Sequence, residues 1–120
     1  VARTTPNAPS KAHRHWTGTL PPYFTKEAIR WLRTHGVAHL LCDVPSVDRE
    51  DDGGELVAHQ AFWDDDGPGP PRTHRTITEM VYVPDSLPDG VYALTIGVPR
   101  FDLDAAPSCP FLIPLSPTTP

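Results

Sequence analysis

The sequence contains little cysteine. It has two in 120 residues, Cys42 in an apolar segment and Cys109 beside Pro110. Two such thiols make neither the disulfide framework of a small secreted domain nor a CxxC pair. We therefore expect both to be ordinary thiols.

The sequence also lacks an excess of positive charge. Ten Lys and Arg residues stand against fifteen Asp and Glu residues, which gives a formal net charge of −5 at pH 7. No basic stripe is present of the kind that binds nucleic acid or an anionic membrane. No apolar run approaches the ~20 residues of a membrane helix, and the polar N-terminal segment lacks the apolar region of a signal peptide. These absences argue against nucleic acid and membrane as partners and predict a soluble, cytoplasmic protein.

What the chain does contain is a series of short apolar segments separated by turn residues, sixteen prolines among them. Its length suits one domain with one core. Thr25 as an N-cap and Gly36 as a stop predict one helix, and residues 55–63 predict a second, shorter one. Strands are expected in the apolar runs 37–42, 76–83, 91–98 and 111–115, and at residues 1–5. We therefore predict a single α/β domain over residues 1–120, with a mixed sheet of about five strands and two helices.

Glu79 is the anomaly of the sequence. Alternation along residues 76–83 places Glu79 on one face with Ile77 and Val81, and both faces of this segment are largely apolar. A carboxylate in a strand covered on both faces must be paired, hydrogen-bonded, protonated or bound to a cation. Together with His59 on the predicted short helix, it would offer a divalent cation one neutral nitrogen and one anionic oxygen. The spacing alone leaves the alternatives open, namely a structural histidine and a glutamate that pairs with a basic residue.

Four segments resemble the second half of the cyclase family, which includes bacterial kynurenine formamidases and isatin hydrolases. They are GTLPPYFTKEAIRWLRTHGVAHLLCDVPSVDRE at 18–50, AHQAFW at 58–63, TITEMVYVPDSLPDGVYALTIGVP at 76–99 and LDAAPSCPFLIPL at 103–115. The likeness covers nearly the whole chain in the family's order. It implies a swivelling β/β/α fold, a dimer or tetramer, and a metal-dependent hydrolase with one or two divalent ions, commonly zinc and in some members manganese.

Residue by residue, the resemblance implies that His59 and Glu79 are metal ligands, because they stand where the family has a metal-binding histidine and glutamate. A bound cation would also explain an ionised Glu79 among apolar neighbours. The acidic, proline-rich loop between the two is an insertion relative to the shorter formamidase pattern.

The chain departs from the family because the first half of the pattern is absent. That half carries an HxxxHxD motif with the other metal ligands, and a further histidine for proton transfer. His35, His39 and Asp43 have the spacing HxxxHxxxD, but His35 ends a predicted helix while His39 lies in the next strand, so they share no helical face. The general base is therefore expected in the missing half, and no catalytic residue is identified in this chain.

Further candidates belong to the substrate pocket. Asp43 and Asp48 end and follow a buried strand, where ligands often gather in α/β sheets, although capping and turn hydrogen bonds also suit short acidic side chains. Phe62 and Trp63 would wall an aromatic pocket, or else belong to the core.

These features predict part of a hydrolase in which a divalent metal activates water for attack on the carbonyl of a small N-formyl or cyclic amide substrate, as in arylformamidases. Activity would need a complementary N-terminal half or a homo-oligomer. The alternative is a truncated, non-catalytic relative that serves as a binding or assembly module.

Overall fold

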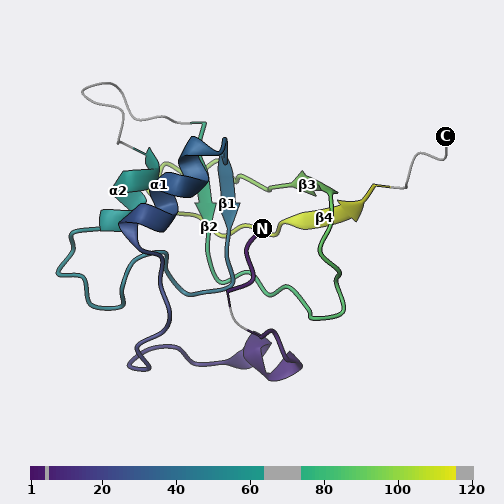
Figure 1. Ribbon diagram of the computed structural model, residues 1–120, viewed down its shortest axis with the longest axis horizontal. Helices are drawn as coiled ribbons and strands as arrows, with labels where there is room; N and C mark the ends of the chain where they lie inside the picture. The colour runs from purple at the N-terminus through teal and green to yellow at the C-terminus, as the bar shows by residue number, and fades with distance from the viewer. Residues whose placement is uncertain (5, 64–73, 116–120) are drawn as a thin grey trace. The chain divides into compact units, whose positions relative to one another are not determined.

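The computed structural model describes residues 1–4, 6–63 and 74–115. The chain divides into two compact units, Val1–Ser86 and Leu87–Pro120, and each is described by itself. The described residues form two α-helices, one short 3-10 helix (Pro9–His13), and four strands in two separate two-stranded sheets (Figure 1). The predicted α/β class is confirmed, whereas the mixed sheet of about five strands is not found in these residues.

The sheet of the first unit pairs β1 (His39–Leu41) with β2 (Thr76–Thr78) in parallel. Just after β1, Cys42 donates its N–H to the carbonyl of Thr78 in β2. On the opposite edge of β1, the N–H of Ala2 donates to the carbonyl of Leu41 at 2.8 Å, and Ala2 forms a parallel bridge with Cys42. The N-terminal end of the chain therefore lies in the same layer as β1 and covers its second edge.

Helix α1 (Lys26–Thr34) begins and ends where the sequence predicts. The hydroxyl of Thr25 caps its start by accepting a hydrogen bond from the N–H of Ala28 at 3.2 Å. The chain leaves the helix through Gly36 at a φ of 83°, in the left-handed region that favours glycine. Ile29 is fully buried, so the apolar side of the helix faces the core.

Helix α2 (Val57–Trp63) is the second predicted helix and packs beside α1 (Figure 1). The core between the helices and β1 consists of Ile29, Leu40, Cys42, Val44, Val47, Ala58, Ala61 and Phe62. Burial raises the pKa of the Cys42 thiol to about 12, so this cysteine is an unreactive core residue, as expected. Within the described ranges, no helix combines the length and the apolar character needed to cross a membrane.

Strand β2 is shorter than predicted, and this changes the surroundings of Glu79. The strand ends at Thr78, and Met80 adopts a φ of 56°, a conformation that residues with a Cβ rarely occupy. Met80 is 64% exposed and so does not belong to a second buried face. The expectation that Glu79 lies inside a strand covered on both faces is therefore wrong, because Glu79 follows the strand immediately before a bend at Met80.

The second unit contains an antiparallel pair, β3 (Tyr92–Thr95) and β4 (Phe111–Pro114). Both strands lie inside the predicted runs 91–98 and 111–115. The prediction of strands at these positions is confirmed, and the observed strands are shorter. The connection from 96 to 110 contains prolines and short polar residues, which suit a loop.

Candidate functional site

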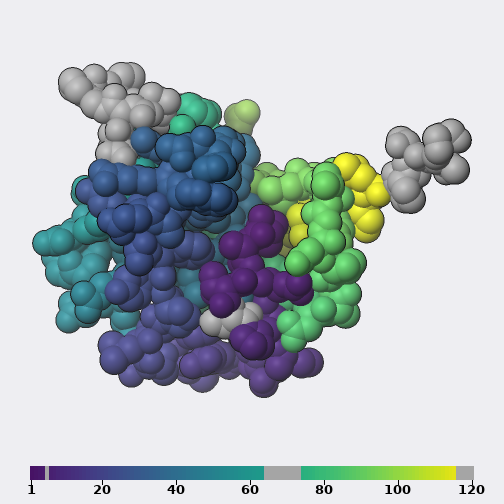
Figure 2. Space-filling view, viewed as in Figure 1, coloured from purple at the N-terminus to yellow at the C-terminus, as the bar shows by residue number. Residues whose placement is uncertain are grey.

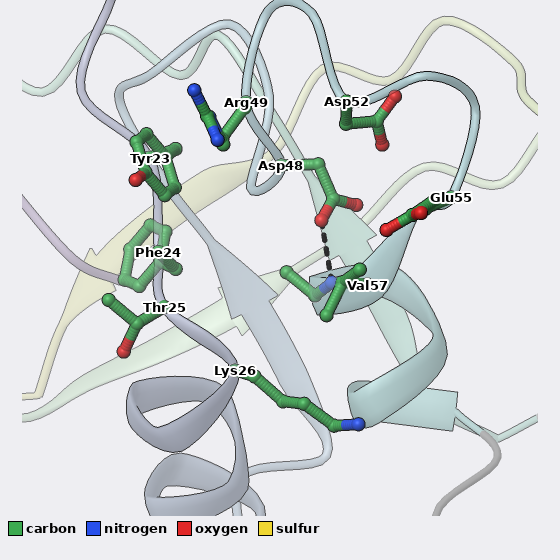
Figure 3. Close-up of a pocket in the computed structure, with 10 residues that line it drawn as sticks. Tyr23, Phe24, Thr25, Lys26, Asp48, Arg49, Asp52, Glu55 and Val57 are labelled. Carbon is green, nitrogen blue, oxygen red and sulfur yellow. Dashed lines mark hydrogen bonds between the residues drawn. The ribbon is translucent and has the colours of Figure 1, made fainter.

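Asp48, which precedes helix α2 in the chain, holds the His59 side chain of that helix in place. Asp48 lies between β1 and α2, and its Oδ1 accepts a hydrogen bond from the N–H of Ala58 at 2.6 Å (Figure 3). Its Oδ2 accepts from the backbone N–H of His59 at 3.2 Å and lies 2.6 Å from Nδ1 of the same residue. Asp48 is buried, so it caps α2 and orients the imidazole at the same time. The capping interpretation of Asp48 is confirmed, while its contact with the His59 ring was not predicted.

Glu79 reaches the other nitrogen of the same ring. Its Oε1 accepts a hydrogen bond from the N–H of Val47 at 2.8 Å and lies 3.4 Å from Nε2 of His59. Both side chains stay partly accessible, 17% for His59 and 27% for Glu79. The structure therefore brings together the two residues that the sequence singles out as metal ligands.

The 3.4 Å between Nε2 of His59 and Oε1 of Glu79 suits two ligands of one metal ion. Zinc binds histidine nitrogen at about 2.0–2.1 Å and carboxylate oxygen at about 2.0–2.2 Å, so two such ligands at a tetrahedral angle lie about 3.4 Å apart. In metal sites the second ring nitrogen of the histidine usually donates to a carboxylate, which is the position of Asp48 here. The donor set therefore fits part of a zinc site.

Among the residues that the structure describes, the site offers two ligands, His59 and Glu79. Catalytic zinc normally takes three ligands from protein, and Asp48 is occupied with the start of α2 and with Nδ1 of His59. In the part of the chain that the structure describes, no group of three or more His, Cys, Asp and Glu side chains is arranged to hold a metal ion. The same contacts also fit an imidazole clamped between two carboxylates for structural reasons.

Of the two roles that the sequence leaves open for Asp43, the contacts in the structure fit the structural one. It is 2% exposed, and it accepts hydrogen bonds from the N–H and hydroxyl of Thr4 at 2.9 and 2.7 Å. Asn7 Nδ2 and Lys11 Nζ donate to it at 3.2 and 2.7 Å. Burial acts to raise the pKa of Asp43, but the hydrogen bonds from Lys11, Thr4 and Asn7 outweigh it and lower the pKa to about 2. Asp43 therefore anchors the N-terminal segment to the end of β1.

The two aromatic candidates, Phe62 and Trp63, differ in burial and in their distance from the candidate site. Phe62 is fully buried, so it is a core residue and does not wall a pocket. Trp63 packs at the edge of the core, and its ring centroid lies 5.2 Å from that of His59, with the two rings tilted by 53°. Of the two, Trp63 is the one that lies beside the candidate site.

The histidines of the HxxxHxxxD spacing have other contacts, as the geometric argument predicted. His35 follows α1, stacks on Trp31 with centroids 4.0 Å apart, and places Nδ1 2.8 Å from the Trp31 carbonyl. His39 is exposed in β1, and its Nδ1 lies 3.0 Å from the hydroxyl of Thr76. With Asp43 bound to the N-terminal segment, these residues do not form a ligand set.

A pocket of about 300 Å³ lies where Asp48 faces residues 23–26 and the start of α2 (Figure 3). The guanidinium of Arg49 lies over the ring of Tyr23 there, 5.7 Å from its centroid. A second pocket, of about 350 Å³, shares Asp48, Arg49 and Asp52 with the first. Asp48 therefore lines both pockets and also holds the imidazole of His59.

Comparison with known proteins found no matching family model, no matching curated protein and no matching solved structure.

Proposed function

We propose that this chain supplies part of the divalent-metal site of a cyclase-like hydrolase, which cleaves a C–N bond of an N-formyl or cyclic amide substrate. The observation that supports it is the spacing of 3.4 Å between Nε2 of His59 and Oε1 of Glu79, in a chain whose segments resemble that family. The helices and the parallel strands of the first unit agree in class with part of a swivelling β/β/α fold.

In this proposal His59 and Glu79 hold the ion. Zinc is the first expectation and manganese the second, because one imidazole nitrogen and one carboxylate oxygen suit either metal. When bound, such an ion polarises a carbonyl group and activates water for hydrolysis.

Two contacts orient the proposed ligands before any metal binds. Asp48 occupies the Nδ1 side of the imidazole at 2.6 Å, which directs Nε2 toward Glu79. The N–H of Val47 holds Oε1 of Glu79 at 2.8 Å. Ligands fixed in this way lose less conformational freedom on binding, so we expect measurable metal binding even from an incomplete site.

The remaining groups would come from outside this chain. A third ligand and the proton-transfer residue would be supplied by a complementary N-terminal half, or by a second copy in a homo-oligomer. With two ligands in place of the usual three, the chain by itself is expected to bind zinc weakly and to turn over little substrate.

The substrate is expected to be a small molecule. The pocket lined by Asp48 has a volume of about 300 Å³, at the lower end of the roughly 300–1,000 Å³ that is usual for such ligands. Its lining carries the carboxylates of Asp48, Asp52 and Glu55 beside Lys26 and Arg49, so it does not favour an anion. Neither His59 nor Glu79 lines it, and Asp48 is the residue that links this pocket to the proposed metal site.

Zinc titration of the whole chain tests the proposed site, with a chromophoric chelator as competitor. His59→Ala and Glu79→Gln should each weaken zinc binding by about tenfold or more, because each removes a direct ligand, and even outer hydrogen-bond partners of metal sites contribute this much. His39→Ala is the matched control, since it removes an exposed histidine whose ring contacts Thr76. Its zinc affinity should equal that of the unchanged chain.

Far-UV circular dichroism of each variant separates loss of metal from loss of fold. If folded His59→Ala and His39→Ala variants bind zinc with the same affinity, the proposed site is refuted.

The second candidate function is a non-catalytic binding or assembly module. It is favoured by the observation that both ring nitrogens of His59 already face carboxylates, so the cluster has a structural use without metal. This alternative predicts no saturable zinc binding by the chain. An HxxxHxD motif encoded upstream of Val1 would favour the hydrolase, and unrelated upstream sequence would favour the module.

A further inference from the structure

Two aspartates in the described part of the chain are each followed by glycine. They are Asp52, before Gly53, and Asp89, before Gly90. A third such pair, at 66 and 67, lies outside the described residues. An aspartate before glycine can rearrange without an enzyme, because no side chain hinders the glycine nitrogen and the glycine backbone turns easily. The two described pairs differ in how the structure holds the aspartate.

The rearrangement consumes no reagent other than water. The backbone nitrogen of the glycine attacks Cγ of the protonated aspartic acid, a C–N bond forms, and the amide proton leaves with the carboxyl hydroxyl group as one water molecule. The product is a five-membered succinimide ring. Water then opens the ring at Cγ, which restores aspartate, or at the main-chain carbonyl, which leaves isoaspartate with the main chain running through Cγ. An aspartate therefore reacts fast only where its side chain is able to turn toward the next nitrogen and to take up a proton.

The structure restrains both steps at Asp52. Its Oδ1 accepts a hydrogen bond from the N–H of Gly54 at 2.8 Å, and its Oδ2 accepts one from the N–H of Leu56, also at 2.8 Å. These two N–H groups lower the pKa of Asp52, so less of the neutral acid is present. The side chain has to break at least one hydrogen bond to a charged group before Cγ meets the nitrogen of Gly53.

Asp89 lies in a part of the chain without a core. Residues 88–91 are all exposed, and none of the residues 87–115 is buried. Segments with few buried contacts open locally at little cost in free energy. Local opening therefore brings the Asp89 side chain and the nitrogen of Gly90 together far more often than the restrained turn at Asp52 allows for its own pair.

We propose that Asp89 is a site of spontaneous isoaspartate formation in this protein, and that the fold protects Asp52 from the same reaction. The ligand of the site is water, and its product is a free carboxylate on a branch of the main chain, the group that protein isoaspartate methyltransferases methylate. No residue of the proposed metal site takes part.

The change would fall beneath a contact at the start of β3. The hydroxyl of Tyr92 donates to the carbonyl of Pro88 at 2.8 Å, so this hydrogen bond spans Asp89 and Gly90. Isoaspartate adds one carbon atom to the main chain between its two ends. The hydrogen bond should therefore be disturbed, and with it the pairing of Tyr92 with Pro114.

Peptide mapping of the whole chain, aged at neutral pH and body temperature, tests the proposal. Chromatography with electron-based fragmentation distinguishes aspartate from isoaspartate, which have equal mass. Isoaspartate should form at residue 89 at least about tenfold faster than at residue 52, because a hydrogen bond to a charged group is strong enough to slow opening by this factor. In concentrated guanidinium chloride, which unfolds the chain, the two rates should become similar.

Gly90→Ala is the matched variant. A Cβ at this position would lie 3.5 Å from Cε2 of Tyr92, which is ordinary contact, and the φ of Gly90 is not in the left-handed region. The variant should therefore keep the circular dichroism spectrum of the unchanged chain. It should slow the reaction at residue 89 several-fold, because the methyl group hinders the attacking nitrogen, and leave the rate at residue 52 unchanged. Asp89→Glu should abolish isomerisation at residue 89, because its ring would need one more carbon.

Two results would overturn the proposal. Equal rates at residues 52 and 89 in the folded chain would show that the two hydrogen bonds of Asp52 give no protection. A rate at residue 89 that is about tenfold or more lower in the folded chain than in guanidinium chloride would show that the fold restrains Asp89 as strongly as it restrains Asp52.

Discussion

Oδ2 of Asp48 lies 2.6 Å from Nδ1 of His59, while the second nitrogen of the ring faces Glu79 at 3.4 Å. One acidic residue thus caps a helix and also sets the direction of the only side chain of that helix with metal-binding chemistry. Because the two uses share one carboxylate, helix stability and metal affinity should change together when it is altered.

Asp48→Asn keeps an oxygen for the cap and removes the charge beside Nδ1. Zinc affinity should fall by about 10–100-fold, the loss typical when the carboxylate behind a metal-binding histidine is removed. Asp48→Ala should also lower the free energy of unfolding by about 0.5–2 kcal/mol, because the cap is lost. Zinc competition and denaturant unfolding measure the two effects. Glu55→Gln, at an exposed position in the same pocket, is the control, and equal zinc affinity in Asp48→Asn and Glu55→Gln would contradict this prediction.

Asp43 should make the first unit sensitive to acid. Its pKa in the folded protein is about 2, below the ordinary value of 3.8, so folding favours the ionised carboxylate. The resulting stability is fully present above the unfolded value and is lost as the pH falls from about 4 to about 2. The difference in pKa corresponds to roughly 2–3 kcal/mol. Unfolding in urea at a series of pH values measures the loss.

The Asp43→Asn variant isolates this effect. It removes the partner of Lys11 in a buried pair 2.7 Å long, so it should lower the free energy of unfolding near neutral pH by about 3–5 kcal/mol. Its stability should also vary less with pH in the acid range. Asp51→Asn, at an exposed acid, is the control. If Asp43→Asn and Asp51→Asn lose the same stability in acid, Asp43 is not the source of the sensitivity.

The left-handed backbone at Met80 predicts an unusual response to substitution. Met80 has a φ of 56° and is 64% exposed, so its side chain contributes little packing while its Cβ strains the backbone. Met80→Gly should therefore leave stability unchanged or raise it by up to about 1 kcal/mol. Met80→Val should destabilise by about 1 kcal/mol or more, because a β-branched residue tolerates this conformation poorly. Thermal and denaturant unfolding distinguish the two, and a more stable Met80→Val than Met80→Gly would contradict the argument.

The two thiols should differ in reactivity. Burial raises the pKa of Cys42 to about 12, whereas Cys109 is exposed. Since the thiolate is the reactive form, a thiol reagent at mildly alkaline pH should modify one cysteine in the folded chain and both in denaturant. Cys109→Ser should abolish the reaction of the folded protein. Rapid modification of Cys42 in that variant would show that the core opens more readily than its packing suggests.

The accuracy of the sequence predictions depends on how local each signal is. Helix α1 was predicted correctly because Thr25 and Gly36 act within one turn of its ends. The surroundings of Glu79 were predicted wrongly because the alternation of residues 76–83 carries no sign that Met80 turns the backbone. Propensity favours a strand there, and the bend at Met80, with its positive φ, overrides it.

In the candidate site, too, contacts between residues far apart in the chain were not predicted from the sequence. His59 and Glu79 were singled out by their chemistry, by the apolar setting predicted for Glu79 and by the family resemblance, and the fold brings them within 3.4 Å of each other. The contact between Asp48 and His59 spans eleven residues of chain, and a loop of that length has no pattern that fixes which side chains meet. The role of Asp43 stayed open between a pocket and structural hydrogen bonds for the same reason, because its donors Thr4 and Lys11 lie more than thirty residues earlier in the chain.

The hydrogen bonds that Thr4, Asn7 and Lys11 give to Asp43 bear on how the protein should be cloned. Deleting the first eleven residues would look harmless from their polar composition, yet it would remove these donors and the bridge from Ala2 that completes the edge of β1. A gene trimmed in this way is expected to yield aggregated protein, and a purification tag is better separated from Ala2 by a spacer.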